Sequence, residues 1–185
     1  MSMPVDARAI ASRATRIHDA DRVEAALDRM AREITAELAG SDPILLCVMN
    51  GGLIVTGLLA VRLQFPLQID YLHMTRYRGA TSGGEIECRV MPALDLRGRV
   101  VLVVDDILDE GNTLSAVLRY CREQGAARIL SAVLVDKRRP RPEALAAADF
   151  SGLHVPDRYV YGYGMDYKNY LRNADGIYAV ADEDM

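Results

Sequence analysis

Apolar residues with helical spacing define the first element of the chain. Between Val23 and Gly40 they recur every three or four positions, which predicts an amphipathic helix. Asp21 and Glu24 have the spacing of a capping box at its start, and Gly40 is a natural stop. We expect the apolar face of this helix to pack against the rest of the fold.

Short runs of apolar and β-branched residues predict strands that alternate with further helices. The clearest strand is Arg99–Val104, and helical patterns follow at 53–63 and 114–124. The other strands are expected at 43–49, within 67–74, at about 85–91 and at 129–135. This alternation predicts an α/β fold with a mostly parallel central sheet flanked by helices and joined by right-handed crossovers.

The last fifth of the chain is rich in tyrosine and breaks this alternation. Strand-like pieces at Arg158–Tyr161 and Ile177–Val180 predict a small C-terminal hood packed against the sheet. No repeat, low-complexity tract or linker divides the sequence. We therefore expect one domain over residues 1–185, with its core at about 40–150 and hood elements mainly at 150–180.

Composition narrows the classes of function. Hydrophobic residues make up 50% of the chain and charged residues 26%, which is typical of a soluble globular protein. No apolar run approaches the roughly 20 residues of a membrane helix, and the N-terminus lacks signal-peptide features, so we expect a cytoplasmic protein without a membrane partner. The net charge of -4, with one short basic cluster at 137–141, argues against nucleic acid. Neither the three cysteines nor the three histidines have the spacing of a metal site.

Polar residues gather where the clearest strand ends. Asp105 and Asp106 follow it directly, and Asp109, Gly111 and Thr113 lie in the turn before the next helix. Backbone N–H groups at a helix N-terminus bind phosphate, and glycine lets the backbone approach it closely. Carboxylates are acceptors that suit sugar hydroxyls or hydrated Mg²⁺. The pattern therefore predicts an anion site beside a sugar or metal site, at the carboxyl edge of the sheet.

The same residues carry a family resemblance. The stretch VVLVVDDILDEGNTL resembles the motif of type I phosphoribosyltransferases that binds phosphoribosyl pyrophosphate (PRPP). Residues 135–138 and 155–172 are similar to the hypoxanthine-guanine branch, and the match covers about residues 43–180. The resemblance implies purine salvage, in which the 5-phosphoribosyl group of PRPP moves to N9 of hypoxanthine or guanine. IMP or GMP and pyrophosphate are the implied products, Mg²⁺ the implied cofactor, and a homodimer or homotetramer the implied assembly.

The resemblance also implies a role for each matching residue. Asp109 is the implied general base or acid near N7 of the purine. Lys137 is implied to donate to O6, Tyr159 to stack on the ring, and the Val160 backbone to read its edge. PRPP is implied to contact Asn50, Gly51, Asp105, Asp106, Glu110, Gly111, Asn112, Thr113 and Arg172. Mg²⁺ is implied to bind Asp105, Asp106 and Asp166.

A polar, glycine-rich segment at Arg76–Glu85 lies between two predicted strands and is interpreted as a mobile loop at a hairpin tip. Tyr77 and Ser82 match the family loop that closes over the site. Such a lid suits the chemistry, because water must be kept from the reactive sugar. Lys137 suits a 6-oxopurine, since an ammonium group favours an oxygen at C6 and penalises the amine of adenine.

Three residues depart from the family pattern. Asn50 stands where relatives often carry a basic residue, Glu110 where a small hydroxyl residue is common, and Asn112 where lysine is frequent. Because the phosphate loop is altered, a second hypothesis stays open, in which the protein is a regulatory protein that senses PRPP. A phosphoribosyltransferase that prefers xanthine or another base also stays open. The retained Asp109 and Lys137 favour the enzyme for hypoxanthine or guanine.

Overall fold

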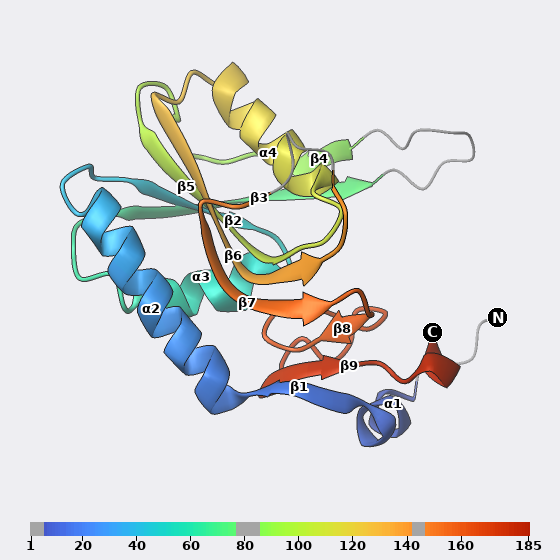
Figure 1. Cartoon of the computed structure of the whole chain (residues 1–185). Coiled ribbons are helices and arrows are strands. Elements are labelled where there is room, and N and C mark those ends of the chain that lie inside the picture. Colours follow the sequence, from blue (N-terminus) through green and yellow to red (C-terminus); the bar gives the residue numbers. More distant parts are fainter. Residues whose placement is uncertain (1–5, 77–85, 142–146) are drawn as a thin grey trace.

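A six-stranded sheet forms the centre of the protein. The computed structural model describes residues 6–76, 86–141 and 147–185 (Figure 1). The sheet has the order β4-β3-β2-β5-β6-β7, and all neighbours run parallel except β4, which pairs antiparallel with β3 at the edge. Its strands are β2 (Ile44–Val48), β3 (Gln68–Arg76), β4 (Ile86–Val90), β5 (Val100–Leu108), β6 (Arg128–Arg138) and β7 (Phe150–Pro156). The predicted α/β fold with a mostly parallel sheet is confirmed.

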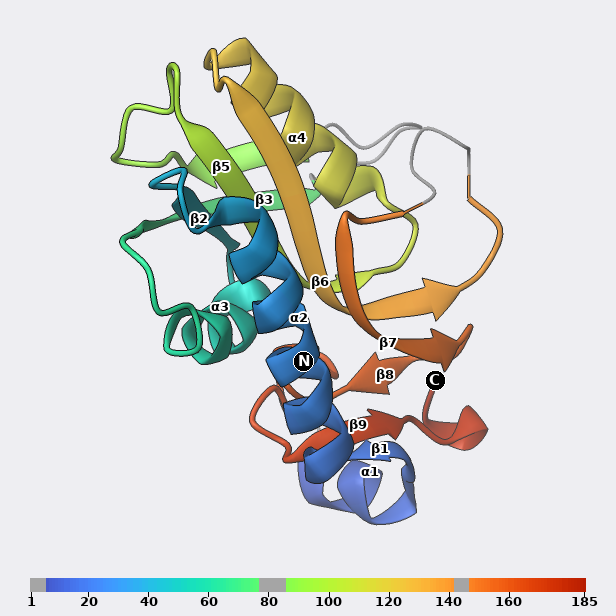
Figure 2. The ribbon, with the colours of Figure 1, turned by 60° about the vertical axis from the view of Figure 1, so that its left-hand side comes forward.

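Helices cover both faces of this sheet. Figures 1 and 2 show α2 (Ala20–Leu38) and α3 (Gly52–Ala60) on one side and α4 (Asn112–Glu123) on the other. The predicted helices are confirmed to within a few residues, but the predicted capping box is wrong. Asp19 caps α2 instead and accepts a hydrogen bond from the Arg22 N–H at 3.0 Å. Across the ranges that the structure describes, no helix is long and apolar enough to cross a membrane.

A second, three-stranded sheet of order β1-β9-β8 forms the hood. It consists of β8 (Val160–Tyr161), β9 (Gly176–Ala179) and β1 (Thr15–Asp19), which follows the short helix α1 (Ala7–Arg13). The expected limits of the hood differ from the structure at both ends. Strand β7 belongs to the large sheet, because it continues the parallel ladder beside β6. Strand β1 comes from the N-terminal region and was not predicted, because its sequence TRIHD lacks an apolar alternation.

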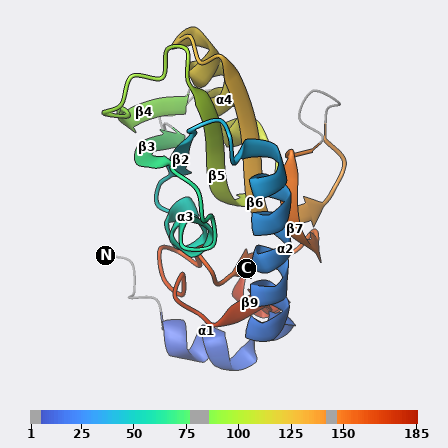
Figure 3. The same cartoon turned by 90° about the vertical axis from the view of Figure 1, so that its left-hand side faces the viewer.

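Helix α2 ties the two sheets together. Its buried face, from Val23 to Leu38, packs in one hydrophobic cluster with large-sheet residues such as Leu134 and with Val160 and Ile177 of the small sheet. Figure 3 shows the helix running along both sheets. A separate cluster, including Val117 of α4, fills the other face. The hood is thereby held at a fixed place beside the carboxyl ends of the large-sheet strands.

The antiparallel pair β3–β4 confirms the predicted hairpin. Its pairing is irregular, since His73 faces Val90 whereas Met74 faces Cys88. The predicted lid residues Tyr77 and Ser82 lie outside the described residues. One connection after β2 is unusual, because the peptide bond between Met49 and Asn50 is cis.

Ile34 tests the role of α2 as the common core of both sheets. The side chain is fully buried, so Ile34→Ala should lower the free energy of unfolding by about 2–5 kcal/mol through lost burial and a cavity. Urea denaturation measures this. Arg32→Ala, at an exposed position of the same helix, is the control and should change stability by less than about 0.5 kcal/mol. Equal losses in both variants would contradict this assignment.

Candidate active site

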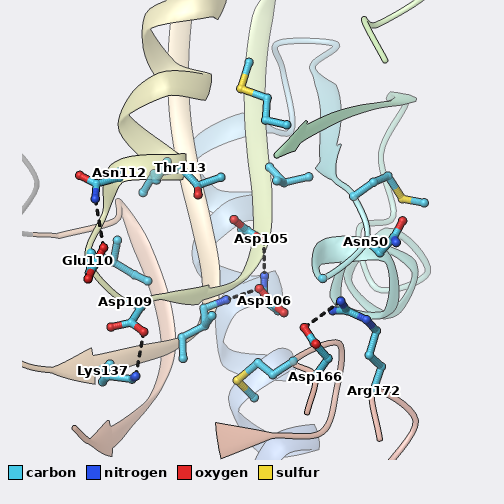
Figure 4. A pocket seen from close by; sticks show the side chains of 18 of the residues that line it. Asn50, Asp105, Asp106, Asp109, Glu110, Asn112, Thr113, Lys137, Asp166 and Arg172 are labelled. Atoms are coloured by element: carbon cyan, nitrogen blue, oxygen red, sulfur yellow. Dashed lines mark hydrogen bonds and ion pairs between the residues drawn. The ribbon is translucent and has the colours of Figure 1, made fainter. Parts of the chain in front are cut away.

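A cavity of about 1320 Å³ opens at the carboxyl ends of the large-sheet strands and is bounded by the hood (Figure 4). The structure brings every described residue of the predicted site to its wall. These residues are Asn50, Gly51, Asp105, Asp106, Asp109, Glu110, Gly111, Asn112, Thr113, Lys137, Tyr159, Val160, Asp166 and Arg172. Residues from four separate stretches of the chain thus share one cavity.

The two neighbouring carboxylates lie within β5, not after it as predicted. The strand extends to Leu108 because its ladder with β6 continues beyond Val104. Asp105 and Asp106 are each only 8% exposed. Burial, followed by repulsion from Asp106, raises the pKa of Asp105 well above its ordinary value, and burial also raises the pKa of Asp106. Binding a cation or hydroxyl donors at this pair would relieve an electrostatic cost already present in the protein.

The N-terminus of α4 is open toward the cavity. Gly111 precedes the helix in a left-handed conformation with φ of 84°, which glycine adopts without steric cost. No side chain caps the helix, and no acidic residue occupies its first turn. Glu110 precedes the helix, and its carboxylate accepts a hydrogen bond from the Asn112 side-chain amide at 3.1 Å. The N–H groups and the helix dipole therefore provide a site for an anion.

A buried lysine and its carboxylate partner form the opposite wall. Lys137 projects from the end of β6 with 8% of its side chain exposed, and its Nζ donates to Asp109 at 2.8 Å. Arg139 donates to the other oxygen of Asp109, also at 2.8 Å. Burial favours a higher pKa for Asp109, but the hydrogen bonds from Lys137 and Arg139 outweigh it and lower that pKa below its ordinary value. The carboxylate is therefore ionised and held by two cations.

The hood contributes an aromatic face beside Lys137. Tyr159 is 39% exposed, and its ring lies 5.5 Å from that of Tyr167. Val160 is buried and pairs with Ala179 in the small sheet, which fixes the backbone next to the tyrosine. A flat ligand could therefore stack on Tyr159 while it contacts the Lys137 ammonium group.

Close glycine contacts join the hood to the sheet. A Cβ atom at Gly51 would clash with the carboxylate of Asp106, and one at Gly164, where φ is 109°, would clash with the Gly51 carbonyl. Larger residues at either position would push the loop after β2 away from Asp106. The cavity wall on this side therefore depends on direct contact between backbone segments.

Arg172 and Asp166 form an ion pair on the same wall. Arg172 lies 2.8 Å from Asp166 Oδ1 and donates to the Gly164 carbonyl at 2.5 Å. The second oxygen of Asp166 accepts the Asn169 N–H at 2.7 Å. Carboxylate oxygens such as those of Asp105, Asp106 and Asp166 are the donors that Mg²⁺ prefers. Within the described part of the chain, however, no three such side chains are already grouped as a metal site.

Sequence reasoning missed several residues of the site. His73 and Arg89 line the cavity from the β3–β4 hairpin, and Asn169 lines it from the hood. Arg139 holds Asp109 without lining the cavity. It lies just past the end of β6, two residues after Lys137, and this spacing was the signal that could have found it. Nothing in the sequence marks the irregular pairing that accompanies Arg89.

Comparisons with known proteins agree with this geometry. The family model for the phosphoribosyl transferase domain matches residues 13–168. Hypoxanthine-guanine phosphoribosyltransferase of Streptococcus pneumoniae is 31% identical over 164 residues, which cover 88% of this chain and 91% of that protein. A solved hypoxanthine-guanine-xanthine phosphoribosyltransferase superposes with a TM-score of 0.79 at 26% identity, over 91% of this chain and 95% of the other.

A fold likeness extends to more distant structures. Hypoxanthine phosphoribosyltransferase from Trypanosoma cruzi, solved with the product IMP, has a TM-score of 0.83 at 24% identity and covers 91% of this chain and 94% of its own. The family model spans most of the sequence, including β2, the strand with the paired aspartates and the open helix N-terminus that follows it. On these grounds the chain belongs to the phosphoribosyltransferase family.

Proposed function

We propose that this protein transfers the 5-phosphoribosyl group of PRPP to N9 of hypoxanthine or guanine and releases pyrophosphate. The observation that carries the proposal is a buried lysine, Lys137, beside an ionised carboxylate and an exposed tyrosine ring in the family's substrate cavity. The relatives named for hypoxanthine and guanine support the same choice of base.

The lysine accounts for recognition of a 6-oxopurine. Its ammonium group has three donors and no acceptor, so it can satisfy O6 of hypoxanthine or guanine but not the amine of adenine. Because the side chain is buried, a wrong partner would leave donors unpaired away from water. Stacking of the purine on Tyr159 would place the edge of the ring beside the Val160 backbone.

Asp109 is suited to manage the purine proton. When O6 draws the Lys137 ammonium group toward itself, the carboxylate loses one of the two hydrogen bonds that lower its pKa. Its affinity for a proton then rises at the moment when the base must lose one. Binding of the correct base would thus activate the group that accepts its proton.

The remaining groups fit PRPP. The N-terminus of α4 suits the 5-phosphate, since Gly111 lets the backbone approach closely and no side chain caps the first N–H groups of the helix. Asp105 and Asp106 are acceptors placed for the ribose hydroxyls. Arg172 suits the pyrophosphate, and Gly51, which lines the same cavity, leaves room for the Asp106 carboxylate.

Mg²⁺ fits the donor set of this cavity. Asp105 and Asp106 are buried carboxylates with raised pKa values, so a divalent cation would stabilise both charged forms. Asp166 would supply a further carboxylate oxygen from the hood, and substrate oxygens would complete the coordination. When bound, the ion would neutralise the charge that develops on the departing pyrophosphate.

Cytoplasmic location and a homodimer or homotetramer stay predictions. The proposed reaction itself is tested by spectrophotometric assays with PRPP, Mg²⁺ and, separately, hypoxanthine, guanine, xanthine and adenine. We expect turnover with the first two bases and little with adenine. PRPP binding without turnover of any base would instead support a regulatory sensor, and a preference for xanthine would redefine the substrate.

Lys137→Ala should relax discrimination between bases. Loss of a charge-assisted hydrogen bond should reduce kcat/KM for hypoxanthine at least about tenfold, and should reduce the ratio of hypoxanthine to adenine kcat/KM. Steady-state kinetics measure both. Lys168→Ala, which removes a lysine outside the cavity wall, is the control and should retain the wild-type ratio. An unchanged ratio in Lys137→Ala would refute the assignment.

Asp109→Asn should separate chemistry from binding. The amide oxygen can still accept from Lys137, but the side chain can no longer take a proton, so kcat should fall about 10²–10⁴-fold. The dissociation constant of PRPP, measured by calorimetry, should change only a few-fold. Near-wild-type kcat in this variant would rule out Asp109 as the general base.

Arg139→Gln should shift the pH dependence. Arg139 helps to lower the pKa of Asp109, so its loss should raise that pKa toward the ordinary value. Asp109 acts as base when ionised, and the acid limb of kcat/KM should therefore move to higher pH. Arg138→Gln, at an exposed neighbouring position, is the control. An acid limb at the same pH in both variants and wild type would contradict this coupling.

A further inference from the structure

Within the part of the chain that the structure describes, one cation of the cavity wall has no internal partner. The described part of this wall holds three cationic side chains, and two of these, Lys137 and Arg172, are each 2.8 Å from a carboxylate of the same wall. Arg89 lines the cavity too, and among the described residues no ion pair or hydrogen bond of its side chain is found. It is therefore the cation of this wall that is available to an incoming anion.

A break in strand pairing positions Arg89. His73 of β3 faces Val90, and the next residue, Met74, faces Cys88, so Arg89 is an extra residue on β4 without a partner of its own. Such a bulge interrupts the regular alternation of side chains and re-aims the extra residue. Arg89 and His73 consequently both line the cavity from the same hairpin.

The position of the hairpin indicates which part of the substrate Arg89 meets. Strand order β4-β3-β2-β5 places the hairpin on the β2 side of the paired aspartates, away from β6 and Lys137. Figure 4 shows Asn50, which follows β2, across Asp105 and Asp106 from Thr113 and Lys137. The open helix N-terminus and the base-binding wall therefore lie on the far side of the aspartates.

The β2 side of the cavity needs a further cation. Asn50 is neutral, and Arg172 is already paired with Asp166. Among the described residues, five carboxylates line the cavity against three cations: Asp105, Asp106, Asp109, Glu110 and Asp166 against Arg89, Lys137 and Arg172. Pyrophosphate bound here would be stabilised most by a guanidinium group that does not first have to break an ion pair. The planar fork of a guanidinium group also matches the spacing of phosphate oxygens.

We propose that Arg89 binds the pyrophosphate group of PRPP and of the released product. The proposal rests on the proposed function, because it assigns one end of the same substrate. Arg89 contacts the pyrophosphate end of PRPP, whereas the purine and the 5-phosphate bind at the opposite wall. It is a binding residue that the bulge in β4 brings into the cavity.

The test compares Arg89→Gln with Arg97→Gln, a matched control that removes the same charge from an exposed position after β4 and outside the cavity wall. Calorimetry measures the dissociation constants of pyrophosphate and of IMP with Mg²⁺, and kinetics measure KM for PRPP. In Arg89→Gln, both the pyrophosphate dissociation constant and KM for PRPP should rise about tenfold, as for loss of a charge-assisted hydrogen bond. IMP binding should stay within about twofold, because IMP has no pyrophosphate.

Arg89→Lys keeps the charge but loses the fork, and should give an intermediate rise in both constants. This variant also decides the matter if Arg89→Gln folds poorly. Equal pyrophosphate affinity in wild type, both Arg89 variants and Arg97→Gln would overturn the proposal, as would an equal loss of IMP and pyrophosphate binding. Absence of turnover in the wild type, with the pyrophosphate difference intact, would instead refute the proposed function alone.

Discussion

The ion pair between Lys137 and Asp109 is the interaction on which the site depends. A buried ammonium group is costly unless a charge is close to it, and here Asp109 lies 2.8 Å away at the end of the neighbouring strand. Parallel pairing of β5 with β6 sets that distance, because Leu108 and Asp136 face one another immediately before the two residues. The same pairing continues β5 past Val104 and buries the paired aspartates. The register between β5 and β6 thus fixes both the Lys137–Asp109 pair and the two buried aspartates of the cavity.

The hood completes the site only because α2 holds it against the large sheet. Helix α2 packs in one cluster with residues of both sheets, so Tyr159 and Val160 keep their place beside Lys137. Gly164 touches the backbone of Gly51 and closes the other side of the cavity. Rigid packing around buried like charges, here Asp105 and Asp106, is common in sites that bind charged substrates, because the ligand supplies the partners that these charges lack.

The sequence allowed five of the six strands of the large sheet and most residues of the cavity wall to be predicted, because apolar runs and a family motif identify them. Strand β7 was not predicted, and its residues were assigned to the hood. Strand β1 was missed since TRIHD has a polar pattern and gains its order from β9, a long-range partner. The extension of β5 through Asp105 and Asp106 was missed for the same reason, as a ladder with β6 overrides the low strand propensity of aspartate. The place of Arg89 depends on a bulge that residue types alone do not reveal, whereas the spacing of Arg139 from Lys137 could have identified it.

The most direct test of the account is the pKa of the Asp109 carboxyl group, followed by ¹³C NMR in the free protein and with saturating IMP. Ribose 5-phosphate, which lacks the base, is the comparison ligand and accounts for the effect of phosphate charge. If O6 draws Lys137 away from Asp109, IMP should raise this pKa more than ribose 5-phosphate does. The same pKa with both ligands would show that the base leaves the ion pair intact, and would contradict the coupling between base recognition and proton transfer.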